Sequence, residues 1–222
     1  PFIMMWLALA VILAILLIVR LSQPYWINWG STRDEQQRSL PGDECHDHDW
    51  VKSTRGLTIR ADPACIWPWL CQMGTGRGGF YSYTLLEHIL GRHTRNARSV
   101  HPEWQQVETG AQINLDQRGG LLVWDQIPDQ YLLLVATPET RRGHPIASEP
   151  RTTWLFFLNP QTDGTTRLIV RSATACGMPT WLHPILAPFM GLASLIMEWK
   201  MLRSIRNMAE RQPRGAILAT MG

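Results

Sequence analysis

The sequence predicts an α+β fold in which a curved antiparallel sheet wraps around a long C-terminal helix, preceded by a single transmembrane helix. Three observations predict this order. The first 21 residues carry no charge before Arg20. Five short stretches rich in β-branched and aromatic residues follow one another between residues 111 and 174, separated by turn signals. Residues 184–212 have the length and apolar pattern of one long helix.

The N-terminal segment has the composition of a membrane anchor. As a helix, PFIMMWLALAVILAILLIVRL would span about 30 Å, the thickness of the hydrocarbon layer. A cleaved signal peptide has a shorter apolar stretch and a small-residue cleavage site, whereas RLSQPYW follows here. We therefore expect residues 1–21 to hold the chain in the bilayer as an uncleaved single span. The candidates for the membrane interface are Arg20, Tyr25, Trp26 and Trp29.

Between the anchor and the sheet, the sequence predicts a linker, a strand and two short helices. Residues 22–50 are polar and interrupted by proline and glycine, which favours an irregular linker. The stretch VKSTRGLTIRA alternates in part and is typical of a strand. Asp62 as a cap and Pro63 at the first position predict a helix over ACIWPWLCQM, which Pro68 limits or kinks. A second helix, FYSYTLLEHILG, is expected to end at Gly91.

The second half of the chain predicts an antiparallel meander and the terminal helix. The strand stretches are AQINL, LLVWDQI, YLLLVAT, TTWLFFL and TTRLIVRSAT, and residues 138–150 form a polar connection that we expect to be exposed. The first half of the last helix is apolar all round, which fits a lipid-lined cavity, a contact with membrane or protein, or a covered core helix. Its second half has one apolar stripe, made by Met197, Met201, Leu202, Ile205 and Met208. This order of elements is that of a helix-grip fold.

Several stretches resemble one superfamily. They are SLPGDE, TRGLTIRADPACIWPWLCQMGTGRGGFYSY, HPEWQQVETGAQINL and MEWKMLRSIRNMAER. They resemble the START-like helix-grip superfamily (SRPBCC), and within it a bacterial branch of largely uncharacterised members. The match covers roughly residues 33–211, and we place the domain at residues 51–211, followed by a tail of residues 212–222. The superfamily includes lipid-transfer proteins, binders of hydrophobic ligands and polyketide cyclases, so the resemblance implies the fold and no single activity.

The distribution of charge predicts an orientation. Arg20, Arg33 and Arg38 follow the span, and no charged residue precedes it. The positive-inside rule then predicts a single-pass protein of the bacterial inner membrane with its domain in the cytoplasm. The formal net charge of +3 is too small to indicate a nucleic-acid partner. The four scattered cysteines are expected to be reduced thiols.

The glycine-rich loop has the letters of a dinucleotide-binding motif. Gly74, Gly76 and Gly79 spell GxGxxG. That motif requires a strand before the loop and a helix after it, within a βαβ unit, whereas a helix is expected before this loop. We therefore interpret the glycines as a tight connection in which positive φ angles are needed. Arg77 is then a donor to loop carbonyls.

Two further stretches contain residue types of metal or acid–base sites. CHDHDW, residues 45–50, offers several ligand types but lacks the second ligand pair of a structural zinc site. HPEW, residues 101–104, contains the HxE part of the zinc-deaminase signature without its PCxxC partner. We expect neither a metal nor a cofactor, and no catalytic residue is assigned.

Two groups of residues are candidates for binding. The candidates for a ligand cavity are the aromatic residues Trp67, Tyr81, Tyr83, Trp104, Trp124 and Trp154. The candidates for contact with a partner are Phe189, Leu192, Leu195 and Ile196. We first expect a non-catalytic accessory subunit of a larger integral-membrane complex, such as a respiratory or photosynthetic one, with an integral-membrane protein as partner. The alternative is binding or transfer of a small apolar ligand (lipid, quinone or pigment precursor), and the third expectation is a cyclase-like enzyme.

Overall fold

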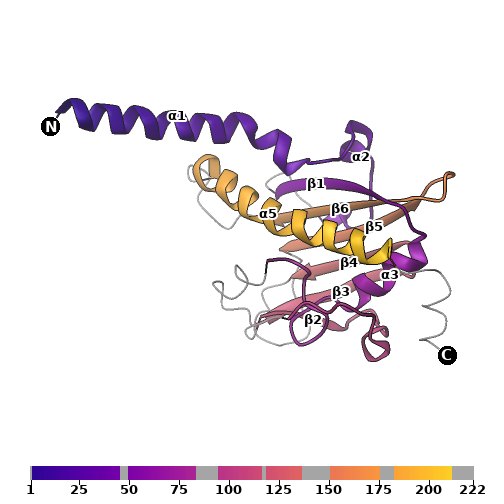
Figure 1. Ribbon diagram of the computed structural model, residues 1–222. Coiled ribbons are helices and arrows are strands. Elements are labelled where there is room, and N and C mark those ends of the chain that lie inside the picture. Colours follow the sequence, from indigo (N-terminus) through magenta and orange to yellow (C-terminus); the bar gives the residue numbers. More distant parts are fainter. Residues whose placement is uncertain are drawn as a thin grey trace.

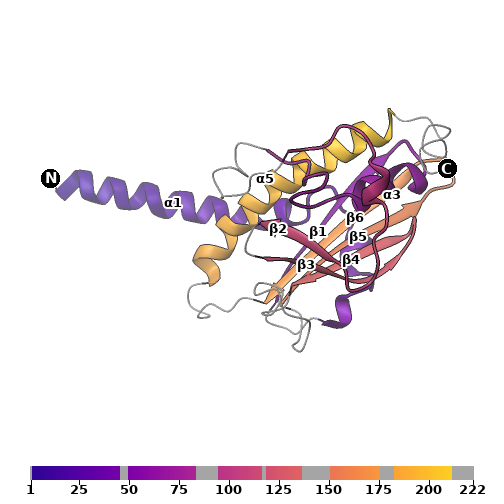
Figure 2. The ribbon, with the colours of Figure 1, turned by 90° about the horizontal axis from the view of Figure 1, so that it is seen from below.

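The computed structural model describes residues 2–45, 50–83, 95–116, 119–136, 151–175 and 183–211. Its centre is a six-stranded antiparallel sheet in the order β1-β6-β5-β4-β3-β2 (Figures 1 and 2). The strands are β1 (Trp50–Ile59), β2 (Gln112–Asp116), β3 (Gly119–Ile127), β4 (Tyr131–Ala136), β5 (Thr152–Pro160) and β6 (Thr166–Ala175). The predicted meander is confirmed, and β1 closes the other edge by pairing with β6 along its whole length.

The long helix α5 (His183–Ala209) lies across one face of this sheet (Figure 1). Its side chains Met201, Leu202 and Ile205 are fully buried in the main core, as the apolar stripe predicts. The short helix α3 (Pro63–Cys71) contributes Ile66 and Leu70 to the same core. The α+β helix-grip fold expected from the sequence is therefore confirmed.

The segment around α3 follows its sequence signals only in part. Asp62 and Pro63 open the helix as predicted, and the helix continues through Pro68 to its last residue, Cys71. The predicted second helix is wrong at its start, because residues 80–83 are not helical and Tyr81 has a φ of 56°. The side chain of Asn96 holds this turn by accepting a hydrogen bond from the Tyr81 amide (2.7 Å). The rest of that predicted helix, and the connection at residues 138–150, lie outside the described residues.

The expected irregular linker is partly helical and packs on the outer face of the sheet. It contains α2 (Arg33–Gln37) and a 3₁₀ turn, η1 (Asp43–Cys45). Leu40 joins a second apolar cluster there with Leu133, Leu155 and Ile169.

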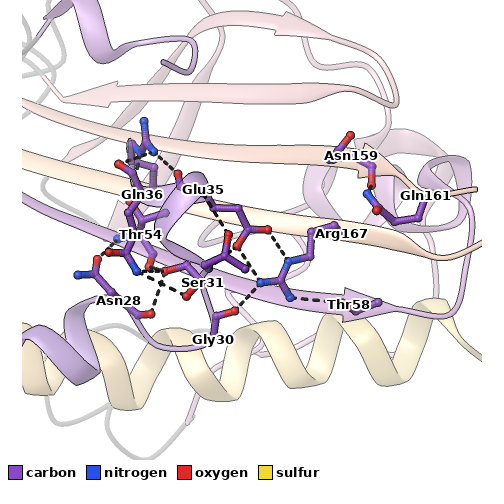
Figure 3. Close-up of polar contacts among 12 residues, drawn as sticks. Asn28, Gly30, Ser31, Glu35, Gln36, Thr54, Thr58, Asn159, Gln161 and Arg167 are labelled. Carbon is purple, nitrogen blue, oxygen red and sulfur yellow. Dashed lines mark hydrogen bonds and ion pairs between the residues drawn. The ribbon is translucent and has the colours of Figure 1, made fainter. Parts of the chain in front are cut away.

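Polar contacts fix the same segment to the sheet. Arg167 of β6 donates to both carboxylate oxygens of Glu35 (2.7 and 2.9 Å), and Ser31 donates to the Thr54 carbonyl (2.8 Å; Figure 3). The buried Arg171 forms an ion pair with Asp43. These contacts hold α2 and η1 close to the sheet, because charge-assisted hydrogen bonds are stronger than neutral ones.

The N-terminal helix α1 (Phe2–Ile27) is longer than the predicted span and projects from the domain (Figure 1). Residues 4–27 are long and apolar enough to cross a membrane, a property that signal sequences and core helices can share. The last turn of α1 packs on the domain: Trp26 is 7% exposed, and Ile27 lies next to Gly191 of α5. The structure thus buries Trp26 where the end of α1 meets the domain.

Candidate functional site

A cavity of about 300 Å³ lies between α5 and the sheet. Its wall is formed by one face of α5, with Ser194, Met197, Glu198 and Met201 at helical spacing. Alternate residues of β5 and β6 form the opposite wall, because alternate side chains share one face of a strand. They are Thr152, Trp154, Ser172 and Thr174. The volume falls at the lower end of the range of ligand-binding pockets.

One side of the cavity is aromatic and apolar. The rings of Phe80 and Trp154 stack at a centroid distance of 6.3 Å, and Leu115 and Leu121 complete this wall. Two buried polar atoms belong to lining residues, Trp154 Nε1 and Ser82 Oγ, and neither has a hydrogen-bond partner within the described part of the chain. Since a buried polar atom without a partner costs free energy, these two atoms lower the stability of this wall.

The other side carries a buried charged network. Arg55 on β1 is fully buried and forms an ion pair with Glu198 of α5, which is 8% exposed. Ser194 donates to Glu198 (3.3 Å) and accepts a hydrogen bond from Arg55 (3.3 Å). A buried ion pair is a costly way to stabilise a core, because both charges lose their hydration. Because Glu198 of this pair lines the cavity, one end of the largely apolar cavity is polar.

The structure brings few of the predicted cavity residues to this cavity. Trp154 lines it as predicted. Trp67 is buried in the main core, and Trp104 lies outside the cavity with its ring 4.4 Å from the ring of His101. Trp124 packs against the cluster on the outer face of the sheet. Its placement differs from the prediction because neighbouring residues of a strand point to opposite faces.

Tyr81 and Tyr83 line a different hollow, which lies along the C-terminal half of α5. Burial raises the pKa of the Tyr81 phenol, and its hydroxyl donates to the Trp69 carbonyl (3.1 Å). Burial also raises the pKa of the Cys71 thiol to about 12. Both groups are therefore neutral at physiological pH. Phe80, expected from the sequence to form a wall of the cavity, does line it. Sequence reasoning missed Ser82 and the Arg55–Glu198 pair.

The glycine loop has the geometry of a tight connection. The φ angles of Gly74, Gly76 and Gly79 are 127°, 81° and 74°, as the interpretation of the loop requires. Gly74 and Gly79 form an isolated antiparallel bridge. Arg77 donates to the Trp104 carbonyl (2.6 Å), which confirms its role as a donor to loop carbonyls. No βαβ unit surrounds the loop within the described residues.

The remaining predicted residues have mixed environments. Leu192 and Ile196 are 37% and 42% exposed, and Leu195 is half-buried. The side chain of Phe189 lies outside the described residues, as do residues 46–49 of CHDHDW. His101 and Glu103 form an exposed contact of 3.2 Å. Within the described residues, His, Cys, Asp and Glu side chains form no group of three able to hold a metal ion.

No protein-family model and no curated protein matches the sequence. Similar solved structures include an AHSA1-like protein from Rhizobium etli, with 13% identity over 73% of this chain and 84% of that chain (TM-score 0.38). Aha1 from Colwellia psychrerythraea has 16% identity over 72% and 97% of the two chains (TM-score 0.41). A polyketide-cyclase-like protein from Corynebacterium glutamicum has 13% identity over 79% and 91% (TM-score 0.31).

Such likenesses concern the fold alone and transfer no activity. The architecture itself carries the assignment: an antiparallel sheet of six strands, with α5 across one face and a cavity between the two. This is the arrangement that the sequence predicts, and the chain has an α+β helix-grip fold.

Proposed function

We propose that this chain binds a small, largely apolar ligand in the cavity between α5 and the sheet. The observation that carries the proposal is the cavity of about 300 Å³ with an apolar wall and a buried polar end. The tryptophan rings do not fill this space, although the sequence is rich in tryptophan. An apolar pocket with a few fixed polar groups is the usual form of a small-molecule site.

The polar end favours an amphiphile with one small polar group. Ser172 and Ser194 provide hydroxyls, and Glu198 provides carboxylate oxygens that accept from a ligand hydroxyl or amine. Arg55 compensates the charge of Glu198 on the side of β1. The ligand classes that we expect are those named from the sequence. A lipid or pigment precursor would donate a hydroxyl or amine hydrogen to Glu198, and the carbonyl of a quinone would accept from a serine hydroxyl.

We further propose that α1 attaches the domain to the bacterial inner membrane, with the domain in the cytoplasm. The apolar length of α1 and the arginines that follow it support this topology. The cavity lies at the end of the sheet where β5 begins and β6 ends. Because α1 projects beyond that same end (Figure 1), an amphiphile leaving the bilayer would have a short path to the cavity.

A second candidate function is the accessory subunit expected first from the sequence. The exposed Leu192 and Ile196 on α5 favour it, since apolar side chains exposed on a helix can cover a partner's surface. This second candidate function requires an integral-membrane protein as the partner.

One experiment separates the two candidates. The full chain is extracted in a mild nonionic detergent and analysed by native mass spectrometry. Ligand binding predicts a monomer that carries a bound amphiphile, and the accessory-subunit role predicts a stoichiometric larger complex. An empty, isolated monomer that binds no amphiphile would contradict both.

A cavity-filling variant locates the ligand. Thr174→Phe places a ring at the cavity wall, and we expect binding of a pyrene-labelled fatty alcohol to weaken about tenfold or more, because the space is lost. Energy transfer from tryptophan to pyrene measures the binding. Thr58→Phe is the matched control, since Thr58 is an exposed strand residue outside the cavity. Equal binding by both variants would place the ligand elsewhere.

A further inference from the structure

A second hollow, separate in character from the apolar cavity, lies along the C-terminal half of α5 and the segment at residues 95–98. Its volume is about 800 Å³. We call it the basic hollow, because the charged residues among its described lining are all cationic. They are Arg95, Arg98, Lys200 and Arg211.

These four cations have no carboxylate partner in the described part of the chain. Elsewhere in the domain the arginines that pack on the sheet are paired: Arg55 with Glu198, Arg167 with Glu35, and Arg171 with Asp43. In the basic hollow, Lys200 lies over the face of the Tyr83 ring, at 5.9 Å from its centroid. Four like charges around one concave space create a positive potential that attracts an anion.

The cations are presented by a fixed frame. Asn96 lies between Arg95 and Arg98, and its side chain accepts from the Tyr81 amide (2.7 Å) and donates to the Ser82 carbonyl (3.0 Å). The amide of the next residue, Ala97, donates to the Gly78 carbonyl (2.9 Å). The segment that carries the two arginines is thus hydrogen-bonded to the glycine loop. Lys200 lies on α5, and Arg211 lies in the turn that follows the helix, where its amide donates to the Met208 carbonyl (3.3 Å).

The other lining groups suit an anion with several oxygen atoms. Ser204 and Asn207 offer further donors from α5, and the ring of Tyr83 is 36% exposed beside Lys200. A phosphate monoester carries a charge of about −1.5 to −2 and three acceptor oxygens at neutral pH, so it can engage several cations at once. A single carboxylate has less charge and fewer acceptors for four cations.

We propose that the basic hollow binds the phosphate group of a small molecule. Two sources supply this chemistry, a soluble phosphorylated compound and the headgroup of a phospholipid. Ser82 is the structural link between them, because it belongs to the lining of both the basic hollow and the apolar cavity. A phospholipid would place its phosphate among the cations and its chain toward the cavity, whereas a soluble phosphate would occupy the basic hollow alone.

The test is calorimetric titration of the full chain, in nonionic detergent and at one fixed ionic strength, with inorganic pyrophosphate and with dihexanoyl phosphatidate. We expect saturable binding of at least one of them. Lys200→Gln and Arg98→Gln should each weaken it about five- to tenfold, because each removes one charge-assisted contact. Arg98 is exposed, so its variant is expected to fold even if Lys200→Gln does not.

The matched control is Arg203→Gln. Arg203 is an exposed cation on the same helix that stacks on the Trp199 ring at 4.0 Å and lies outside the lining. Its variant should bind as the unaltered chain does. Absence of saturable binding by both compounds, or an equal loss with Arg203→Gln, would overturn the proposal.

The two sources are told apart with the pyrene-labelled alcohol bound in the apolar cavity. A soluble-phosphate site predicts that pyrophosphate binds while the alcohol stays bound. A headgroup site predicts that dihexanoyl phosphatidate binds more tightly than pyrophosphate and displaces the alcohol. The phosphate site does not depend on the ligand proposed for the cavity, since pyrophosphate binding is measured whether or not the alcohol binds.

Discussion

Gly79 and Tyr81 show how single residues set the shape of the site. Both have positive φ angles, 74° and 56°. Glycine adopts such angles at no steric cost. Tyr81 is held there by two hydrogen bonds, which its amide donates to the Asn96 side chain and its hydroxyl donates to the Trp69 carbonyl. This turn directs Phe80 and Ser82 to the cavity wall. Backbone strain at a tyrosine is therefore coupled to the position of the aromatic wall.

The first prediction compares two glycines of the loop. A Cβ atom added at Gly76 would have no atom within 4 Å, while one at Gly79 would lie 2.5 Å from Asn96 Oδ1 and 3.0 Å from the Arg95 carbonyl oxygen. Gly76→Ala should therefore lower the free energy of unfolding by about 1 kcal/mol, the cost of positive φ alone. Gly79→Ala should lower the free energy of unfolding by clearly more, because the added Cβ also displaces the Asn96 side chain from the Tyr81 amide.

Chemical denaturation of both variants measures this difference. Because Asn96 lies in the basic hollow, Gly79→Ala should also weaken pyrophosphate binding, and Gly76→Ala should leave it unchanged. Equal destabilisation by the two substitutions would show that the contact with Asn96 has no energetic weight.

Trp124 and Trp154 illustrate what residue type cannot reveal. Both were predicted at the cavity from the same argument, yet they point to opposite faces of the sheet. Trp154 is paired with Leu134 and Ser172, and Val123 rather than Trp124 continues this row on β3. A shift of one residue in register exchanges the two faces of a strand. The pairing register therefore decides which tryptophan lines the cavity.

At the scale of elements, polar contacts hold α2 and α5 on opposite faces of the sheet. Arg55 joins β1 to Glu198 of α5 on the cavity side. Arg167 joins β6 to Glu35 of α2 on the outer side. The capping box of Thr32 and Glu35 starts α2, and the same glutamate then pairs with the sheet. Local capping and tertiary packing thus depend on one carboxylate.

The second prediction is a pH dependence that arises from Glu35. Burial of its carboxyl group opposes ionisation, but hydrogen bonds and charge from Arg167 and the Thr32 amide outweigh it, so the pKa of Glu35 lies below 4.5 in the folded chain. The unfolded chain then binds the proton first as the pH falls. Glu35 therefore contributes stability above about pH 4.5 that is lost as the pH falls through its folded pKa.

Thermal melts of the unaltered chain and of Glu35→Gln between pH 3 and 7 measure this contribution. The variant should be less stable at pH 7, and its melting temperature should fall less steeply on acidification. Asp34→Asn is the control, because it removes one negative charge from the same helix and leaves the Glu35–Arg167 ion pair in place. Parallel profiles for Glu35→Gln and the unaltered chain would argue against the Arg167 contact.

At the scale of the whole molecule, α1 is joined to the domain rather than attached through a loose linker. Trp26 is buried, its carbonyl accepts from Arg55 Nε (3.4 Å), and the Trp29 carbonyl accepts from the Gly56 amide (3.1 Å). These contacts with β1 fix the orientation of α1 relative to the sheet. A membrane helix fixed in this way would orient the cavity relative to the bilayer.

The third prediction compares two shortened chains. A chain beginning at Arg33 loses Trp26, Trp29 and their contacts with β1, whereas a chain beginning at Tyr25 keeps them and loses most of α1. The shorter chain should be less stable by about 3 kcal/mol, the typical cost of removing one buried tryptophan ring. Equilibrium denaturation of both chains in the same buffer measures it. Equal stabilities would show that the end of α1 contributes nothing to the folded domain.

The sequence by itself determined the apolar N-terminal helix, the start of α3, the five strands of the meander and the stripe on α5. These are local properties, since the periodicity of apolar residues and the turn residues act over a few neighbours. The tertiary structure alone decided where Trp26 and Trp124 lie, that Arg55 meets Glu198, and that four cations surround one hollow. Those outcomes depend on strand register and on contacts between residues far apart in the chain, which no local pattern encodes.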